Sequence, residues 1–118
     1  MGILIVEKDN ISAELIYEIF IEDVKNLFFT CDCIQASIAF RKYNPSVIIV
    51  DLDISIIDVI DLIEIIKAEN SKIKIIAIYS IANINDIKEN LAKYHIDALI
   101  KKEDLHNSLY DNYKILDI

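Results

Sequence analysis

Acidic residues directly follow two of the short apolar runs in this sequence. Glu7 and Asp9 come after the first run, and Asp51 and Asp53 come at the end of the third. Carboxylate oxygens are the ligands that a hard divalent cation such as Mg2+ prefers in proteins. One carboxylate could also attack a phosphoryl group while a metal ion and an ammonium group neutralise the developing charge. The spacing therefore favours an acidic site that binds a cation or receives a phosphoryl group.

Five apolar runs could position these acids. The runs are continuous rather than alternating, which is typical of strands buried on both faces of a sheet. They cover residues 3–6, 27–31, 47–50, 73–78 and 98–100. Helix-length stretches separate them, and this alternation predicts an α/β fold with an open parallel sheet and helices on both faces. Ligands bind outside the carboxyl ends of such strands, so Glu7, Asp51, Ser80 and Lys101 should meet at one edge.

The stretches between the runs carry helix signals. An apolar stripe on the first stretch is formed by Ile11, Leu15, Ile16, Ile19 and Phe20. A less regular stripe on the second is formed by Ile34, Ile38 and Phe40. Ser55 with Asp58 resembles a capping box that opens a third helix. Asn83 with Asp86 predicts a cap for a fourth helix, which Leu91 would extend. The last helix is expected over residues 103–113.

Composition limits the remaining functions. The chain has 118 residues, 54% of them hydrophobic, and a formal net charge of -8. This length predicts a single domain over residues 1–118 with a sizeable core. The negative charge argues against direct binding to nucleic acid, because phosphate contacts need a basic face. No uncharged apolar run reaches about 18 residues, and the first acidic residue comes too early for a signal peptide. We therefore expect a cytoplasmic protein that crosses no membrane.

Glycine and cysteine usage excludes two further kinds of site. Gly2 is the only glycine and precedes the first run, whereas dinucleotide-binding folds and P-loops need glycines after a strand. Cys31 and Cys33 are the only cysteines, and we expect two inert thiols that form neither a local disulfide nor a shared metal site. No histidine base or activated Ser or Cys nucleophile is evident, and the sequence therefore predicts no enzymatic activity on a free small substrate.

Four segments carry a family resemblance: ILIVEKD at 3–9, NPSVIIVDLDIS at 44–55, IIAIYS at 75–80 and DALIK at 97–101. Through these segments the chain resembles a receiver domain of the two-component response-regulator family over nearly its whole length. The resemblance implies a flavodoxin-like, doubly wound sheet of five parallel strands in the order 2-1-3-4-5, with helices on both faces. It also implies that Asp51 stands at the phosphoacceptor position.

Lys8 departs from the family pattern. The family has two adjacent acids after its first strand, and Lys8 stands where the second acid, a direct metal ligand, is expected. An ammonium group cannot ligate Mg2+, and it is a donor that could pair with Asp51. The resemblance thus implies Mg2+ held by Glu7, Asp51 and Asp53, with Asp9 as a substitute ligand, in a pocket altered by Lys8.

Two alignments are open for the switch hydroxyl and the phosphate-binding lysine that the resemblance implies. One pairs Tyr79 with Lys101. The other pairs Ser80 with Lys102 and restores a hydroxyl that can move toward a phosphoryl group. The apolar residues before Lys101 favour the first alignment. The candidate residues are therefore Asp51, Ser80 and Lys101, with Tyr79 and Lys102 as alternatives.

Two functions follow from the resemblance and its departures. In the first, Asp51 accepts a phosphoryl group from a histidine kinase or phosphotransfer protein with the help of Mg2+. The face made by the fourth helix, fifth strand and fifth helix then acts on a downstream protein or output domain. In the second, the chain is a pseudo-receiver, a phosphorylation-independent interaction module in which Lys8 neutralises the pocket. Apolar residues on the last two helices are also compatible with a homodimer.

Overall fold

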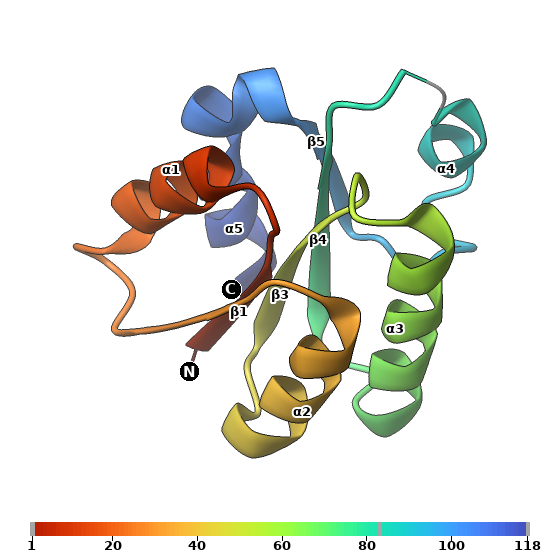
Figure 1. Ribbon diagram of the computed structural model, residues 1–118, viewed down its shortest axis with the longest axis horizontal. Helices are drawn as coiled ribbons and strands as arrows, with labels where there is room; N and C mark the ends of the chain where they lie inside the picture. Colours follow the sequence, from red (N-terminus) through yellow and green to blue (C-terminus); the bar gives the residue numbers. More distant parts are fainter. Residues whose placement is uncertain (1, 83, 118) are drawn as a thin grey trace.

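A computed structural model describes residues 2–82 and 84–117, so the cap predicted at Asn83 lies outside the described residues. Five parallel strands form one sheet in the order β2-β1-β3-β4-β5. The strands are β1 (Gly2–Val6), β2 (Asn26–Thr30), β3 (Val47–Asp51), β4 (Lys74–Tyr79) and β5 (Ala98–Lys101). The predicted flavodoxin-like, doubly wound topology is confirmed (Figure 1).

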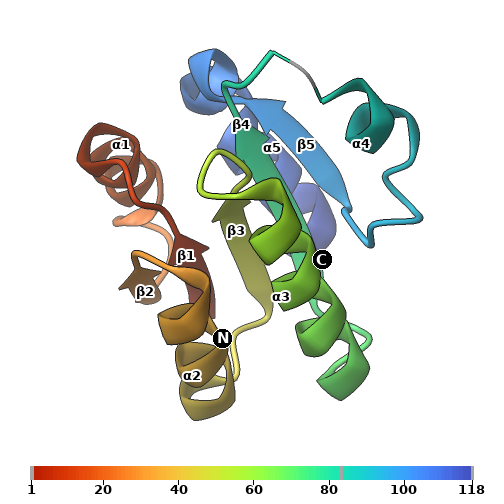
Figure 2. The same cartoon turned by 45° about the vertical axis from the view of Figure 1, so that its right-hand side comes forward.

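Helices cover both faces of the sheet, as the two ribbon views show (Figures 1 and 2). The helices α1 (Asn10–Phe20) and α5 (Leu105–Asp117) pack on one face. The helices α2 (Cys33–Tyr43) and α3 (Ile56–Glu69) pack on the other, together with the short α4 (Asn85–Glu89). A 3-10 helix, η1 (Lys102–Asp104), joins β5 to α5. Within the described part of the chain, no helix has the length and apolar character needed to cross a membrane.

Successive residues of β1 face different cores. Ile3 and Ile5 belong to the core beneath α1 and α5, whereas Leu4 and Val6 belong to the core beneath α2 and α3. Every residue of β1 and β3 is buried, which explains their continuous apolar sequences. The edge strand β2 differs, because its residues are exposed or half-buried. The expectation of burial on both faces is therefore wrong for this strand.

The second helix buries a set of residues that the sequence did not predict fully. Ala36, Ala39 and Phe40 face the core, whereas Ile34 and Ile38 are 76% and 60% exposed. The buried residues recur at a spacing of three to four, which defines one face of a helix. Ile34 and Ile38 lie off that face, so two large apolar side chains remain at the surface.

The predicted start of α3 is confirmed, whereas the predicted length of α4 is wrong. Ser55 accepts a hydrogen bond from the Asp58 backbone N–H at 3.3 Å, which confirms the predicted cap of α3. The helix α4 ends at Glu89 and is shorter than expected, so Leu91 lies beyond it. The side-chain amide of Asn90 donates a hydrogen bond to the backbone carbonyl oxygen of Asp86 at 2.8 Å. Such local side-chain bonds compete with helix continuation and account for the early end.

The register of the sheet brings the chemical residues to one edge. Val6 pairs with Val50, so Glu7 and Asp51 follow neighbouring positions at the ends of β1 and β3. At the ends of β4 and β5, Tyr79 pairs with Lys101. The carboxyl ends of four strands therefore meet at the edge where a site was expected.

Candidate functional site

Asp51 lies at the centre of this edge. It is the last residue of β3 and is only 2% exposed. Its Oδ1 accepts a hydrogen bond from the Asp53 backbone N–H at 2.8 Å. Its Oδ2 accepts one from the Lys102 ammonium at 2.7 Å. A buried carboxylate needs partners of this kind, because an unpaired charge away from water is costly.

The Lys102 ammonium is shared by three carboxyl groups. Besides Asp51, its Nζ lies 3.2 Å from Oδ2 of Asp53 and 3.7 Å from Oε2 of Glu7. Burial alone would lower the pKa of Lys102. The hydrogen bond and charge of Asp51, together with the hydrogen bond of Asp53, outweigh burial and raise the pKa above its usual value. Lys102 is therefore a firmly charged cation at the point where the acids meet.

Glu7 is the least satisfied member of this group. Its Oε1 accepts a hydrogen bond from the Asp9 backbone N–H at 2.8 Å. Its Oε2 is buried and accepts no hydrogen bond from any residue that the structure describes. Burial, and then the neighbouring Asp51 carboxyl, raises the pKa of Glu7 from 4.5 to about 8. In the metal-free protein Glu7 is therefore mainly protonated near neutral pH.

Asp53 ties the loop after β3 to the loop after β4. Its carboxylate accepts hydrogen bonds from the Ser80 backbone N–H at 3.0 Å, from the Ile81 backbone N–H at 3.1 Å and from the Ser80 hydroxyl. Burial alone would raise the pKa of Asp53, but these hydrogen bonds from Ser80 outweigh it, and the pKa lies below its usual value. We call this set of contacts the Asp53 latch.

The structure brings together most of the predicted site residues but not Lys101. Glu7, Asp51 and Asp53 surround the ammonium of Lys102, which belongs to the alternative alignment, and Ser80 joins this group through its hydrogen bond to Asp53. Lys101 instead lies 3.1 Å from Glu103 and is half exposed. The chain turns into η1 directly after Lys101, and this turn carries the next lysine back over the strand ends. The aligned hydroxyl of Ser80 was the sequence signal that favoured Lys102.

Tyr79 and Asp9 have roles in folding. Tyr79 is buried and packs in the core beneath α2 and α3. Asp9 is the N-cap of α1, and its carboxylate accepts hydrogen bonds from the Ile11 backbone N–H at 3.1 Å and from the Ser12 hydroxyl at 2.8 Å. Its oxygens are thus engaged at the start of the helix, as expected for a capping aspartate.

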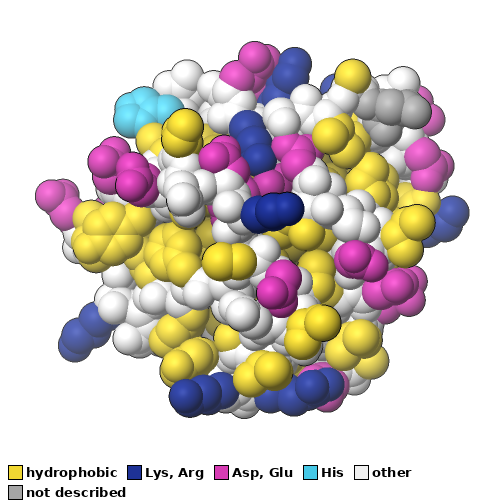
Figure 3. All heavy atoms as spheres, viewed as in Figure 1, with side chains coloured by type: hydrophobic (Ala, Val, Ile, Leu, Met, Phe, Trp, Pro, Cys, Tyr) yellow, Lys and Arg dark blue, Asp and Glu magenta, His cyan; other side chains and the backbone are white. Residues whose placement is uncertain are grey.

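An open pocket of about 340 Å³ beside Asp51 gives access to the site. Its lining includes Lys8, Asp9, Asp51, Asp53 and Lys102. Acidic and basic side chains lie close together near the strand ends in the space-filling view (Figure 3). Two of the lining groups are ammonium groups, so the pocket is not purely acidic.

The donor set does not form a ready Mg2+ site. Among residues 2–82 and 84–117, no three His, Cys, Asp or Glu side chains are placed to hold a metal ion together. Lys8 supplies no oxygen, Asp9 caps a helix, and the Lys102 ammonium lies between the remaining carboxyl groups. The orphaned Glu7 oxygen could accept a cation, but it is one ligand where Mg2+ needs several oxygens.

Comparison with known proteins identifies the family. The model of the family described as "Response regulator receiver domain" matches residues 3–112. The chain belongs to this family. No curated protein sequence matches it. Receiver domains are in general non-enzymatic signalling modules that interact with histidine kinases or phosphotransfer proteins and with output domains, and they typically bind Mg2+.

Solved structures with the same fold are distant in sequence. A response regulator from Thermotoga maritima superposes with a TM-score of 0.85 at 17% identity, covering 98% of this chain and 95% of that one. The receiver domain of a signal transduction histidine kinase from Syntrophus aciditrophicus gives 0.81 at 23% identity, covering 98% and 88%. The Mn2+-bound response regulator Rcp1 gives 0.68 at 19%, covering 98% and 88%. These likenesses support the fold of this receiver domain.

The pKa of Glu7 predicts how this receiver domain responds to pH. Between pH 4.5 and about 8 the folded state keeps a proton that the unfolded chain has released. The resulting stability is complete below pH 4.5 and is lost as pH rises through 8. Glu7→Gln stays neutral throughout. Its free energy of unfolding, relative to that of the wild type, should therefore rise by about 2–4 kcal/mol between pH 5 and 9. Urea unfolding of both proteins in EDTA measures this difference. Curves of unfolding free energy against pH that stay parallel for the two proteins would contradict the prediction.

The Asp53 latch predicts local protection of the loop after β4. Asp53→Ala removes the acceptor of the Ser80 and Ile81 amides, so hydrogen exchange at these two amides should accelerate at least about tenfold. Hydrogen exchange measured by NMR checks this. Asp111→Ala, an exposed change on α5, should leave both rates unchanged. Equal rates in the wild type and Asp53→Ala would show that the latch does not hold the loop.

Proposed function

We propose that this receiver domain accepts a phosphoryl group on Asp51 from the phosphohistidine of a histidine kinase or phosphotransfer protein. The observation that carries the proposal is the ion pair between Asp51 and Lys102 beside an open pocket. The carboxylate is a nucleophile at the strand end, and the ammonium is a cation already in position for the charge of a phosphoryl group.

The proposed transfer needs only the chain's own groups and the donor. A carboxylate oxygen of Asp51 forms a bond to phosphorus, and the bond from phosphorus to the donor's histidine nitrogen breaks. That nitrogen keeps the electron pair, and the imidazole takes up a proton. Lys102 and Lys8, which both line the pocket, neutralise the charge on the phosphoryl oxygens.

Activation would compete with the Asp53 latch. The Ser80 hydroxyl and the Lys102 ammonium both contact Asp53, so a phosphoryl group on Asp51 must draw these groups away from that carboxylate. The loop after β4 would then move and alter the neighbouring α4, β5 and α5. We propose this face as the contact with a downstream protein or output domain, with no direct binding to nucleic acid by this domain.

Mg2+ is proposed only as a weak ligand of this chain. The family typically binds it, and Rcp1 is described in a Mn2+-bound form. Lys8 here replaces an oxygen ligand with a positive charge, and Glu7, Asp51 and Asp53 already share the ammonium of Lys102. Mg2+ would have to displace that ammonium and recruit waters for its remaining ligand positions.

A second candidate function rests on the latch itself. With Ser80 already bound to Asp53 and a cation already paired with Asp51, the loops have their contacts without any phosphoryl group. Such a pseudo-receiver would be a constant interaction module, whether it binds another protein or a second copy of itself. The two candidates differ in whether Asp51 reacts.

Acetyl phosphate tests the reactivity of Asp51. The wild type should gain one phosphoryl group, seen by intact-protein mass spectrometry, and EDTA should reduce the yield less than about twofold because two ammonium groups lie in the pocket. Asp51→Asn should gain none, since an amide oxygen is a poor nucleophile. Asp111→Asn, the matched surface change, should react like the wild type. A wild-type domain without the adduct, and without NMR shifts near Asp51, would favour the pseudo-receiver.

Lys8 variants test the metal pocket. Lys8→Asp supplies an oxygen ligand and removes a positive charge, so its affinity for Mg2+ should rise at least about tenfold over the wild type. Lys8→Ala, which removes the charge alone, should gain less. Lys25→Asp makes the same charge change at an exposed position elsewhere and should gain almost nothing. Amide shifts of Asp51 and Asp53 during Mg2+ titration report the affinity, and unchanged affinity in Lys8→Asp would place the defect outside Lys8.

A further inference from the structure

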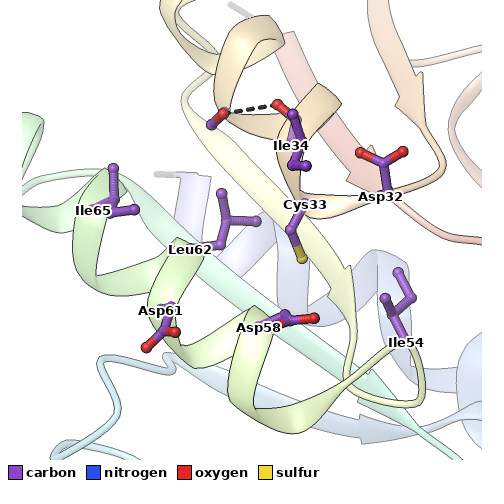
Figure 4. A pocket seen from close by; sticks show the side chains of 9 residues that line it. Asp32, Cys33, Ile34, Ile54, Asp58, Asp61, Leu62 and Ile65 are labelled. Carbon is purple, nitrogen blue, oxygen red and sulfur yellow. Dashed lines mark hydrogen bonds between the residues drawn. The ribbon is translucent and has the colours of Figure 1, made fainter.

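A groove runs between α2 and α3 on the face of the sheet opposite α1 and α5. Its volume is about 390 Å³, within the range of about 300–1,000 Å³ that ligand pockets span. Apolar side chains form its floor and sides (Figure 4). Leu62 is 3% exposed at the base, whereas Ile34 and Ile65 are 76% and 47% exposed. Large apolar side chains left so exposed are the kind that a partner covers.

The rim of this groove is acidic. Asp32 stands on the α2 side, and Asp58 and Asp61 stand on the α3 side (Figure 4). No lysine or arginine lines the groove, and within the described ranges none forms a salt bridge with these three carboxylates. The same negative charge acts on the Cys33 thiol. Its pKa is raised first by burial and then by the charges of Asp58 and Asp32.

The shape of the groove suits an elongated occupant. Asp58, Asp61, Leu62 and Ile65 recur along one face of α3 at spacings of three, four and seven residues, so acid and apolar groups line the same track. Arg41 of α2 lies 3.2 Å from Glu69 of α3 and bridges the two helices near their carboxyl ends. The helical residues that line the groove come from the parts of both helices that precede this ion pair.

We propose that this groove docks a basic, amphipathic segment of a partner protein. Apolar side chains of the segment would cover Ile34 and Ile65, and its lysines or arginines would pair with Asp32, Asp58 and Asp61. This is the helix-in-groove mode, with specificity from charge complementarity. The same acids repel an anionic lipid surface, and the net charge of -8 opposes a second copy of this chain.

The groove also adjoins the phosphoacceptor pocket. Ile54 lines both, so an occupant would touch the loop that follows Asp51. Docking itself needs no phosphoryl group. The wild type and Asp51→Asn should therefore bind alike, and failure of this proposal would leave the proposed role of Asp51 untouched.

A designed peptide provides the probe. It is an amphipathic helix of about 14 residues, with leucines at helical spacing on one face and lysines on the other. Titrated into methyl-labelled protein, it should shift the Ile34, Leu62 and Ile65 methyl signals in a saturable way. A peptide with glutamate in place of lysine, and one with serine in place of leucine, should each bind at least about fivefold more weakly.

Matched variants on α3 separate this groove from general attraction to an acidic protein. Asp61→Asn should weaken peptide binding about two- to fivefold, whereas Glu64→Gln, an exposed neighbour that does not line the groove, should not. Ile65→Ser should weaken it roughly tenfold, whereas Ile57→Ser, on the same helix but outside the lining of the groove, should not. All four positions are exposed, so folding should be retained and circular dichroism checks it.

Three results would overturn the proposal. The first is equal weakening by Asp61→Asn and Glu64→Gln. The second is a set of shifted methyl groups that excludes Ile34, Leu62 and Ile65. The third is occupation of the groove by another surface, seen as self-association of the chain or as binding to anionic vesicles with the same methyl shifts and no peptide.

Discussion

The ammonium group of Lys102 lies within 2.7–3.7 Å of carboxyl oxygens that come from two strand ends and the following loop. Parallel strands that end together bring Glu7 and Asp51 side by side, and such carboxyl groups repel one another when both are charged. Breaking a buried ion pair by removing one partner costs about 3–5 kcal/mol. The raised pKa of Glu7 and the charge of Lys102 both reduce the repulsion between carboxyl groups at this edge of the sheet.

The buried strands and the acid at the end of the third could be predicted because both leave local signals, whereas the order of the strands came only from the family resemblance. The apolar runs of β1 and β3 are continuous because each strand is covered on both faces, and Asp51 interrupts such a run at its end. The choice between Lys101 and Lys102 could not be made locally. It depends on the 3-10 turn after β5, which aims the second lysine at a carboxylate 51 residues away in the sequence.

The exposed isoleucines of α2 show a different limit. Hydrophobic periodicity identifies a helix and its apolar side. In α2, however, the small residues Ala36 and Ala39 face the core in place of the larger isoleucines. The face that carries Ala36, Ala39 and Phe40 packs on the core, and Ile34 and Ile38 lie outside it. Sequence alone gives these isoleucines the same weight as buried ones, because periodicity does not say which of two apolar faces packs on the sheet.

The charges at the strand ends explain why this site differs in kind from an acidic metal pocket. Asp51 and Asp53 are carboxylates, Lys8 and Lys102 are ammonium groups, and Glu7 is mainly protonated near neutral pH in the metal-free protein. With Asp9, which also lines the pocket, three carboxylates face two ammonium groups, so the pocket is close to balanced without a divalent ion. Adding Mg2+ would give the pocket excess positive charge, whereas adding a phosphoryl group would bring negative charge that the two lysines can offset. On charge alone, the two lysines oppose a divalent cation and favour an anion. Under the proposed transfer, the Asp53 carboxylate is the internal anion with which an incoming phosphoryl group would compete for Lys102 and Ser80.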